Sequence, residues 1–164
     1  MTGMTWAGSF FAATLLAAVG SGLIAGVFYA FSTFVMRALA QRPPAEGMAA
    51  MQAINVAVIN PLFLGVFLGT AGACALAAAG AVTRWEQPGS AYVFAGAALY
   101  LAGTFGVTIV CNVPLNNVLA ALAPTDPAAG ALWATYLRRW TRWNHVRTLA
   151  AVAALVAFIL GVRE

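Results

Sequence analysis

The stretch from Ala7 to Met36 contains no charged residue. A helix rises about 1.5 Å per residue, so this stretch is long enough to cross the roughly 30 Å hydrocarbon core of a bilayer and project beyond it. It is too long for the core of a signal peptide and has no basic leader, which favours a retained span. Only 7% of the chain is charged, against about 25% in soluble domains. These features predict an integral membrane protein.

Three further apolar stretches follow, so residues 1–164 are expected to form one all-α domain, a bundle of four transmembrane helices. Prolines and polar residues separate the stretches. Glu46 to Val58 predicts a short helix between the first two spans, and Asn60 and Pro61 suit the N-cap and first position of the next helix. The expected spans cover residues 7–36, 61–83, 91–112 and 143–162.

The fourth helix carries the most informative pattern. No proline interrupts residues 128–162, and the apolar part from Thr148 to Val162 is shorter than the roughly 20 residues that a span needs. The span must therefore borrow residues from an extended amphipathic N-terminal half, which brings Arg147 to the membrane boundary or inside it. Helical spacing predicts one stripe in that half, with His145 about 100° away from it. The predicted stripe consists of Trp133, Tyr136, Trp140, Trp143, Asn144 and Arg147.

Four spans place most of the unusual polar residues at one mouth of the bundle. The end of the first span, the start of the second, the end of the third and the start of the fourth all meet there. Six of the eight arginines lie on that side, whereas Arg84 and Arg163 lie on the other. The excess of basic residues on cytoplasmic loops then predicts a cytoplasmic mouth and external termini in the cell membrane.

Arg147 is the strongest candidate for a functional residue, because a guanidinium at membrane depth is costly; snorkelling to lipid headgroups is the alternative. Asn112, Asn116 and Asn144 are catalytic candidates, or else hydrogen-bonding residues between helices. His145 is a candidate base, or an ordinary interfacial residue. Aromatic and polar residues near the mouth either bind substrate or belong to an aromatic belt. The predicted substrate-binding residues are Trp140, Trp143, Tyr136, Trp133, Tyr29, Ser32, Asn55 and Asn60.

Other kinds of site find little support. One histidine, four acidic residues and no Cys/His cluster predict no metal site, and Cys74 and Cys111 are expected to be buried and unpaired. The arginines flank spans rather than forming a basic patch, so no nucleic-acid partner is expected. GxxxG steps at Gly22/Gly26 and Gly65/Gly69 either pack inside the bundle or, if exposed, favour a homodimer.

Four segments together resemble the anthrone oxygenase-like family of small four-helix membrane proteins. They are FYAFSTFVMRAL (28–39), the run from Met51 to Pro61, NVPLNN (112–117) and WTRWNHVRT (140–148). The resemblance covers essentially the whole chain. It implies an oxygenase that converts an anthrone to an anthraquinone with O₂ and no cofactor. The positions that carry the family pattern are Asn112, Pro114, Asn116, Trp140, Trp143, Asn144 and Arg147.

Such an enzyme would hold a flat hydrophobic substrate, stabilise its anion and remove one proton. The tryptophans and Tyr136 suit stacking on the rings, and the asparagines and Arg147 suit an oxyanion. Two alternatives stay open from the residues. In the first, the chain is a non-catalytic protein that binds a lipid or quinone or acts as the subunit of a partner. In the second, it is a haem or redox carrier. Membrane lipid is an expected partner in every case.

Overall fold

The computed structural model describes residues 2–123, 126 and 129–164, with side chains from Gly8 onward. These residues form helices and no strands, and four helical arms are long and apolar enough to cross a membrane. The predicted all-α, four-span fold is therefore confirmed. The arms cover Gly8–Ala40, Pro61–Thr83, Ser90–Ala120 and Ala129–Arg163.

The first arm is continuous, with one irregular turn. α1 (Thr2–Ala30) leads into the π-helical segment η1 (Phe31–Val35) and then α2 (Met36–Ala40). The helix therefore continues past the predicted end of the span at Met36. Arg37 is exposed and does not interrupt the helix, since a charged side chain at a bundle end can reach solvent.

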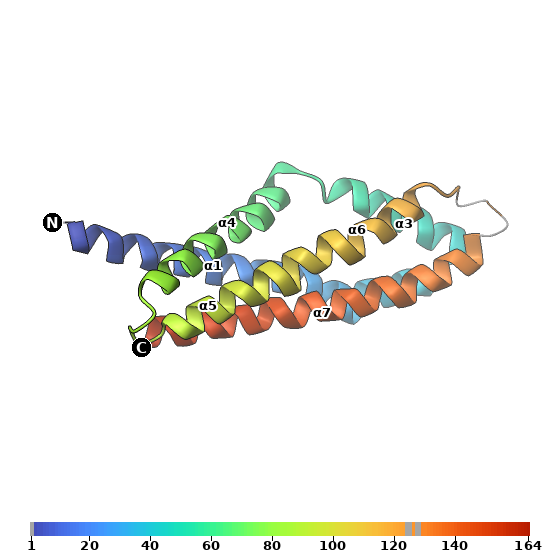
Figure 1. Ribbon diagram of the computed structural model, residues 1–164. Coiled ribbons are helices and arrows are strands. Elements are labelled where there is room, and N and C mark those ends of the chain that lie inside the picture. Colours follow the sequence, from blue (N-terminus) through green and yellow to red (C-terminus); the bar gives the residue numbers. More distant parts are fainter. Residues whose placement is uncertain (1, 124–125, 127–128) are drawn as a thin grey trace.

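The second arm is broken in the middle. After a turn at Pro43, the predicted short helix α3 (Pro44–Ala57) runs back along the bundle, and α4 (Pro61–Thr83) continues in the same direction (Figure 1). Asn60 caps α4 as predicted, because its Oδ1 accepts hydrogen bonds from the backbone N–H groups of Leu62 and Phe63 at 3.1 and 3.0 Å. The break between α3 and α4 lies beside the site described below.

The third arm also departs from a regular α-helix. It consists of α5 (Ser90–Ala98), the π-helical segments η2 (Leu99–Gly106) and η3 (Thr108–Asn112), and α6 (Val113–Ala120). Pro114 lacks an N–H and its ring would clash with the carbonyl four residues earlier in a regular helix. The wider turn of η3 directly before it accommodates the proline, so the helix runs beyond the predicted end at residue 112.

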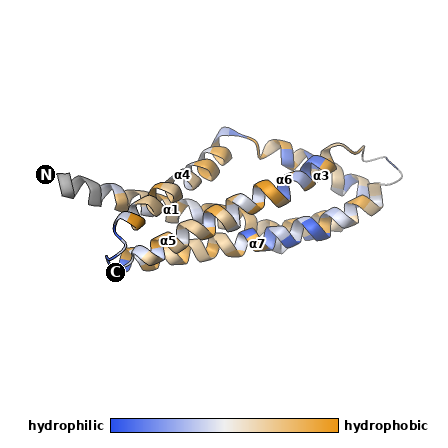
Figure 2. Cartoon of the chain, in the orientation of Figure 1, coloured by the Kyte–Doolittle hydropathy of each residue, from blue (hydrophilic) through white to orange (hydrophobic). Residues whose placement is uncertain are grey.

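The fourth arm is a single helix, α7 (Ala129–Arg163), about 50 Å long at the usual rise. Both described ends of the chain and the 84–89 turn lie at one end of the molecule, while α3, the end of α6 and the start of α7 lie at the other (Figure 1). Hydrophilic residues concentrate at that second end and along the first half of α7 (Figure 2). The polar groups therefore meet at one mouth of the bundle, as the sequence predicted.

Glycines bring the helices together, but of the two predicted steps only Gly22 faces a neighbour, since a Cβ there would lie 3.5 Å from Leu155 of α7. A Cβ on Gly26, Gly65 or Gly69 would meet nothing within 4 Å, so these residues do not pack against the bundle. Close approach occurs instead at Gly20 on α1, which faces Thr70, and at Gly103 in η2, which faces Ala150 of α7. Gly65 and Gly69 lie exposed on α4, and a homodimer through them stays a prediction.

The interior divides into two clusters. One fills the regular half of the bundle with small residues and rings, including Ala77, Tyr100 and Phe158. The other surrounds the mouth and contains Met48 and Trp133. Cys74 and Cys111 are both free thiols; Cys74 is buried as expected, whereas Cys111 is only half-buried. The mouth therefore has its own apolar support, which holds the first half of α7 in place.

Gly103→Ala tests the packing of the third arm on α7. Its new Cβ would lie 2.6 Å from the Cβ of Ala150, which has no rotamer to escape into, so the helices must separate. We expect a loss of about 1–3 kcal/mol in the free energy of unfolding in detergent. Gly26→Ala is the matched control and should be neutral or slightly stabilising, since alanine is the better helix former. Equal losses in both variants would contradict this packing.

Candidate functional site

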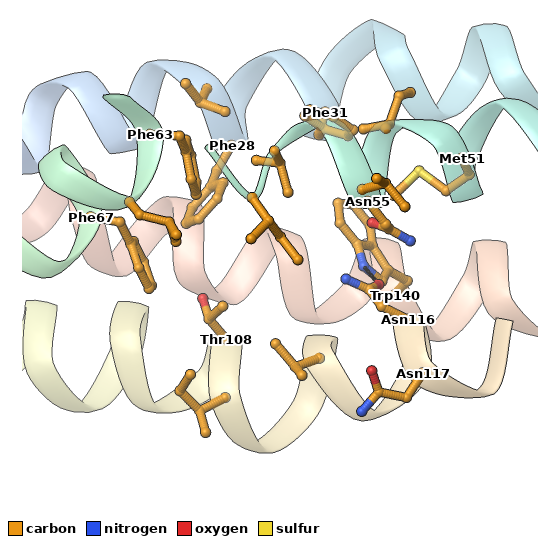
Figure 3. A pocket seen from close by; sticks show the side chains of 18 of the residues that line it. Phe28, Phe31, Met51, Asn55, Phe63, Phe67, Thr108, Asn116, Asn117 and Trp140 are labelled. Atoms are coloured by element: carbon orange, nitrogen blue, oxygen red, sulfur yellow. Dashed lines mark hydrogen bonds between the residues drawn. The ribbon is translucent and has the colours of Figure 1, made fainter. Parts of the chain in front are cut away.

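A cavity of about 620 Å³ lies between the arms on the mouth side of the bundle. Its walls are mainly apolar and aromatic, and Figure 3 shows these side chains converging from all four arms. This volume lies within the range of pockets that bind small organic molecules. The aromatic lining residues are Phe28, Phe31, Phe63, Phe67 and Trp140, and the polar ones are Gln52, Asn55, Thr108, Asn116, Asn117 and Arg147.

The cavity lies where three of the four arms are irregular. η1 contributes Phe31, η3 contributes Thr108, and the break between α3 and α4 contributes Val58 and Ile59. Regular helices pack by fitting side-chain ridges into grooves, which leaves little empty space. A π-turn shifts the side chains that follow it and often marks a functional site. The irregular turns thus explain why the bundle is hollow here.

One side of the cavity opens toward the surface of the bundle that faces lipid. Three apolar residues that line the cavity are more than half exposed: Val56, Ile59 and Leu68. Ile109, which also lines it, is 49% exposed. These four residues lie on α3–α4 on one edge and on the third arm on the other. The cavity is therefore bordered by apolar side chains where it reaches the surface of the bundle.

Arg147 supplies the charge of this site. It is only 5% exposed, and its guanidinium carbon lies 3.7 Å from the ring centre of Phe28 and 4.8 Å from that of Trp140. Its Nε donates to Asn144 Oδ1 at 3.0 Å, and one terminal nitrogen donates to Thr108 Oγ1 at 3.3 Å. No described carboxylate pairs with it. The aromatic faces and neutral acceptors hold a full positive charge beside an apolar cavity.

Asn144 positions Arg147 from behind. It is fully buried on α7, and its Nδ2 donates to the carbonyl oxygen of Phe28 at 2.8 Å and to Ser32 Oγ at 2.7 Å. With both N–H donors directed at the first arm, its Oδ1 faces Arg147 and accepts from Nε. This one amide therefore fixes the guanidinium and ties α7 to α1 and η1.

Asn116 presents a donor to the cavity. Its Oδ1 accepts hydrogen bonds from Tyr136 Oη at 2.9 Å and Trp140 Nε1 at 2.8 Å. An indole nitrogen can only donate, so the oxygen of the Asn116 amide must point toward α7. Its Nδ2 has no partner among the described residues. Because Asn116 lines the cavity, this group remains available to a bound molecule.

Aromatic rings stack along α7 and fix Trp140. Trp133 and Tyr136 lie 5.6 Å apart between ring centres with nearly parallel planes, and Tyr136 lies 6.2 Å from Trp140. Phe31 of η1 contacts Trp140 from the other side at 5.5 Å. Stacked aromatic pairs add to the stability gained from burial alone. The indole of Trp140 is thus a rigid wall of the cavity.

The polar groups gather at two places along the apolar cavity. Thr108 lies near Phe28 and Phe67 in Figure 3, at the deeper end where Arg147 also donates to it. Asn55, Asn116 and Asn117 lie together toward the mouth in the same view. A ligand that fits both groups has an apolar body with polar atoms at two positions.

The structure brings most of the predicted site residues together. Arg147, Trp140, Asn116 and Asn55 line the same cavity, which gives the proposed stripe and asparagine cluster a common location. The others form its support rather than its lining. Asn144, Ser32, Tyr136 and Asn112 are the supporting residues, and Asn112 acts through its Nδ2, which donates to the carbonyl oxygen of Trp140 at 3.2 Å.

Five predicted residues lie outside the lining and its hydrogen-bond support. Trp143 is 38% exposed, because it is turned about 100° from its neighbour Asn144; the predicted stripe is wrong at this residue. Tyr29 is 60% exposed, since the π-turn of η1 separates it from the face that carries Ser32. His145 is exposed, Asn60 caps α4, and Trp133 packs against Gly47.

Several lining residues were not predicted. Phe63 and Phe67 of α4 are ordinary span residues by sequence, and only the long-range packing shows which face they use. Thr108 left a weak signal, because Thr104 and Thr108 are polar residues one turn apart in an apolar span. Among the described residues, no group of three or more His, Cys, Asp or Glu side chains could hold a metal ion.

Asn144→Leu tests whether this amide holds the site together. The change keeps the branched skeleton of the side chain but removes three hydrogen bonds and leaves Arg147 Nε without an acceptor. We expect a loss of roughly 1–3 kcal/mol in the free energy of unfolding. Asn117→Leu is the same chemical change at an exposed position and should change the free energy of unfolding by less than about 0.5 kcal/mol. Thermal unfolding in detergent measures both, and equal effects would contradict the supporting role of Asn144.

Searches of curated proteins and of solved structures found no match. The sequence model of the anthrone oxygenase family matches residues 59–157. That segment contains α4, the third arm and most of α7, and so includes Thr108, Asn116 and Arg147. Because the match covers more than half of the chain, the protein belongs to the anthrone oxygenase family.

Proposed function

We propose that the protein is a membrane-embedded oxygenase that oxidises an anthrone-like polycyclic substrate with O₂. The observation that carries this proposal is the position of Arg147, a buried cation with no carboxylate partner among the described residues, at the wall of a largely apolar cavity. A positive charge in such a place is costly unless it serves an anion that forms there. Family membership supports an oxygenase-like role.

The cavity suits a flat, hydrophobic molecule. An anthrone has three fused rings, with a carbonyl on the central ring and a CH₂ group opposite it. Phe28, Phe63 and Trp140 offer ring faces and edges for stacking, and the volume of about 620 Å³ admits a molecule of this size. The carbonyl oxygen would lie at Arg147, and ring hydroxyl groups would face Asn55 and Asn116.

Arg147 would act on the first chemical step. Loss of one proton from the CH₂ group turns the ketone into an enolate, which places negative charge on the oxygen. Arg147 has N–H groups beyond the two that bind Asn144 and Thr108, and these can donate to that oxygen. Such donors are most effective where water is excluded and where they are fixed before the charge appears.

The remaining steps need only O₂. The enolate carbon gives one electron to O₂, and recombination forms a C–O bond, so that protonation yields a hydroperoxide. Removal of the second C–H proton and cleavage of the O–O bond then form the new carbonyl and release water. One oxygen atom ends in the quinone and the other in water. The substrate loses two hydrogens and four electrons, which reduce O₂ completely.

Water is the proton acceptor in this proposal. The cavity lining contains no carboxylate, histidine or lysine among the described residues, and His145 lies outside it. Arg147 makes the substrate a stronger acid by stabilising its enolate, which reduces the demand on the base. The excess of arginine at the mouth supports a cytoplasmic position for this end of the bundle.

The open side of the cavity also favours a second function. Its exposed apolar edge, which includes Ile59 and Leu68, would admit a lipid or a quinone from the membrane without any reaction. Such a binding protein would use Arg147 to hold a carbonyl or headgroup oxygen. Binding and turnover therefore have to be measured separately.

Arg147→Met provides the main test. Methionine keeps an unbranched apolar side chain but removes every donor, and the loss of one oxyanion donor typically lowers kcat about 10²–10³-fold. We expect that loss in O₂ uptake and quinone formation by purified protein with an anthrone, after subtraction of the protein-free rate. The melting temperature should stay level or rise, because replacing a buried charge by an apolar side chain is often stabilising. Arg147→Lys should retain part of the activity.

The outcomes separate the two functions. Wild-type protein that does not exceed the protein-free rate but binds the anthrone would favour the binding function. Wild-type activity that Arg147→Met leaves intact would contradict the assigned role of Arg147. A fall in both activity and melting temperature would instead indicate a structural role for the arginine.

Asn116→Asp tests the second polar position. The aspartate can still accept from Tyr136 and Trp140, but it replaces the free Nδ2 donor with an acceptor that repels an electron-rich substrate. We expect KM to rise about tenfold with a smaller change in kcat, measured by the same O₂ uptake. Asn117→Asp, at the exposed rim, should change KM less than threefold. Equal changes would show that the effect is general charge near the mouth.

A further inference from the structure

A second depression lies between the first arm and α7, at the same end of the bundle. It has a volume of about 400 Å³ and shares no lining residue with the main cavity. Arg37 of α2 and Arg138, Arg142 and His145 of α7 line it. Between them lie apolar side chains, including those of Met36 and Leu137. We refer to this depression as the arginine groove.

The arginine groove carries uncompensated positive charge. No carboxylate lines it, and none of its three arginines forms a salt bridge with a described acid. Arg42 shows the contrast, since it lies outside the groove and pairs with Glu46. Arg138 donates to the neutral Thr135 at 3.3 Å, and no described carboxylate accepts from it. An anion bound here would therefore meet several guanidinium groups that no described carboxylate neutralises.

The position of the groove along α7 corresponds to lipid headgroups. If Arg163 marks one face of the hydrocarbon core, then Arg147 lies about 24 Å from that face at the usual helical rise. Arg142 and Arg138 lie about 31 Å and about 38 Å from it. The hydrocarbon core is about 30 Å thick, with headgroups beyond it. The groove thus begins at the carbonyl level of the bilayer and extends through the headgroup layer.

We propose that the arginine groove binds the phosphate of an anionic membrane phospholipid. Guanidinium groups bind phosphate oxygens through paired hydrogen bonds, and basic depressions between membrane helices suit anionic headgroups. Met36 and Leu137 lie at about the level of the arginines, next to Arg37 and Arg138 in the chain, and add apolar surface to the groove. Charge and depth together select a phospholipid over a soluble anion.

The proposal does not depend on the oxygenase function. The groove and the cavity are separated by Ser32, which lines the groove and bonds through its hydroxyl to Asn144 and Thr148. Lipid binding can therefore be measured without turnover. Loss of activity in Arg147→Met would leave the lipid proposal standing, and loss of lipid binding would leave the oxygenase proposal standing.

The test compares two double variants of the full chain in nanodiscs or detergent. Arg138→Gln/Arg142→Gln removes two groove arginines, whereas Arg84→Gln/Arg139→Gln removes the same charge from residues outside the groove. Native mass spectrometry measures the phosphatidylglycerol or phosphatidylcholine that each protein retains. We expect wild type and the control to retain phosphatidylglycerol in preference to phosphatidylcholine, and the groove variant to bind it about tenfold more weakly.

Three results would overturn the proposal. The first is equal retention of the two lipids by wild type. The second is an equal loss in the two double variants, which would show general electrostatic attraction. The third is displacement of phosphatidylglycerol by millimolar inorganic phosphate, which would show a site for a free anion. Melting curves of both variants check that the groove variant remains folded.

Discussion

The bundle is arranged around one constraint, a buried guanidinium with which no carboxylate of the described residues pairs. Arg147 lies about 24 Å from the far end of α7, at a depth where a free charge is expensive. Two ring faces and two neutral acceptors hold it in place. An aspartate at position 144 would pair with it and cancel the charge. Asparagine fixes the guanidinium and leaves its charge to act on the cavity.

The space beside Arg147 comes from irregular helices. A regular four-helix bundle would close at this level, because side chains on straight helices interlock. Here η1 and η3 shift the first and third arms, and the second arm stops between α3 and α4. Gln52 stabilises this arrangement, since its Nε2 donates to the carbonyls of Leu119 and Leu122 near the end of α6. These two hydrogen bonds hold α3 against the end of α6 and so fix the mouth of the bundle.

The features that could be predicted from the sequence are those that depend on residues close together in the chain. Apolar length predicted four spans, proline and asparagine predicted the start of α4, and helical spacing predicted that Trp140 and Arg147 share a face. Tyr29 was misplaced because a π-turn changes the spacing that the prediction assumes. Phe63 and Phe67 could not be chosen, since every face of an apolar helix has a similar pattern. Helix approach at Gly103 depends on a neighbour distant in sequence, Ala150, so no local glycine step reveals it.

The arginines of α7 have different surroundings because they lie at different positions along the helix and on different faces of it. Arg147 faces inward, where two aromatic faces lie against its guanidinium and no described carboxylate pairs with it. Arg138 and Arg142 face the first arm, where they line the arginine groove and are exposed at the surface of the bundle. The polar link between the two environments is short, running from Ser32 through Asn144 to Arg147. A single helix therefore places one guanidinium inside the bundle, beside the cavity, and others on its surface in the arginine groove.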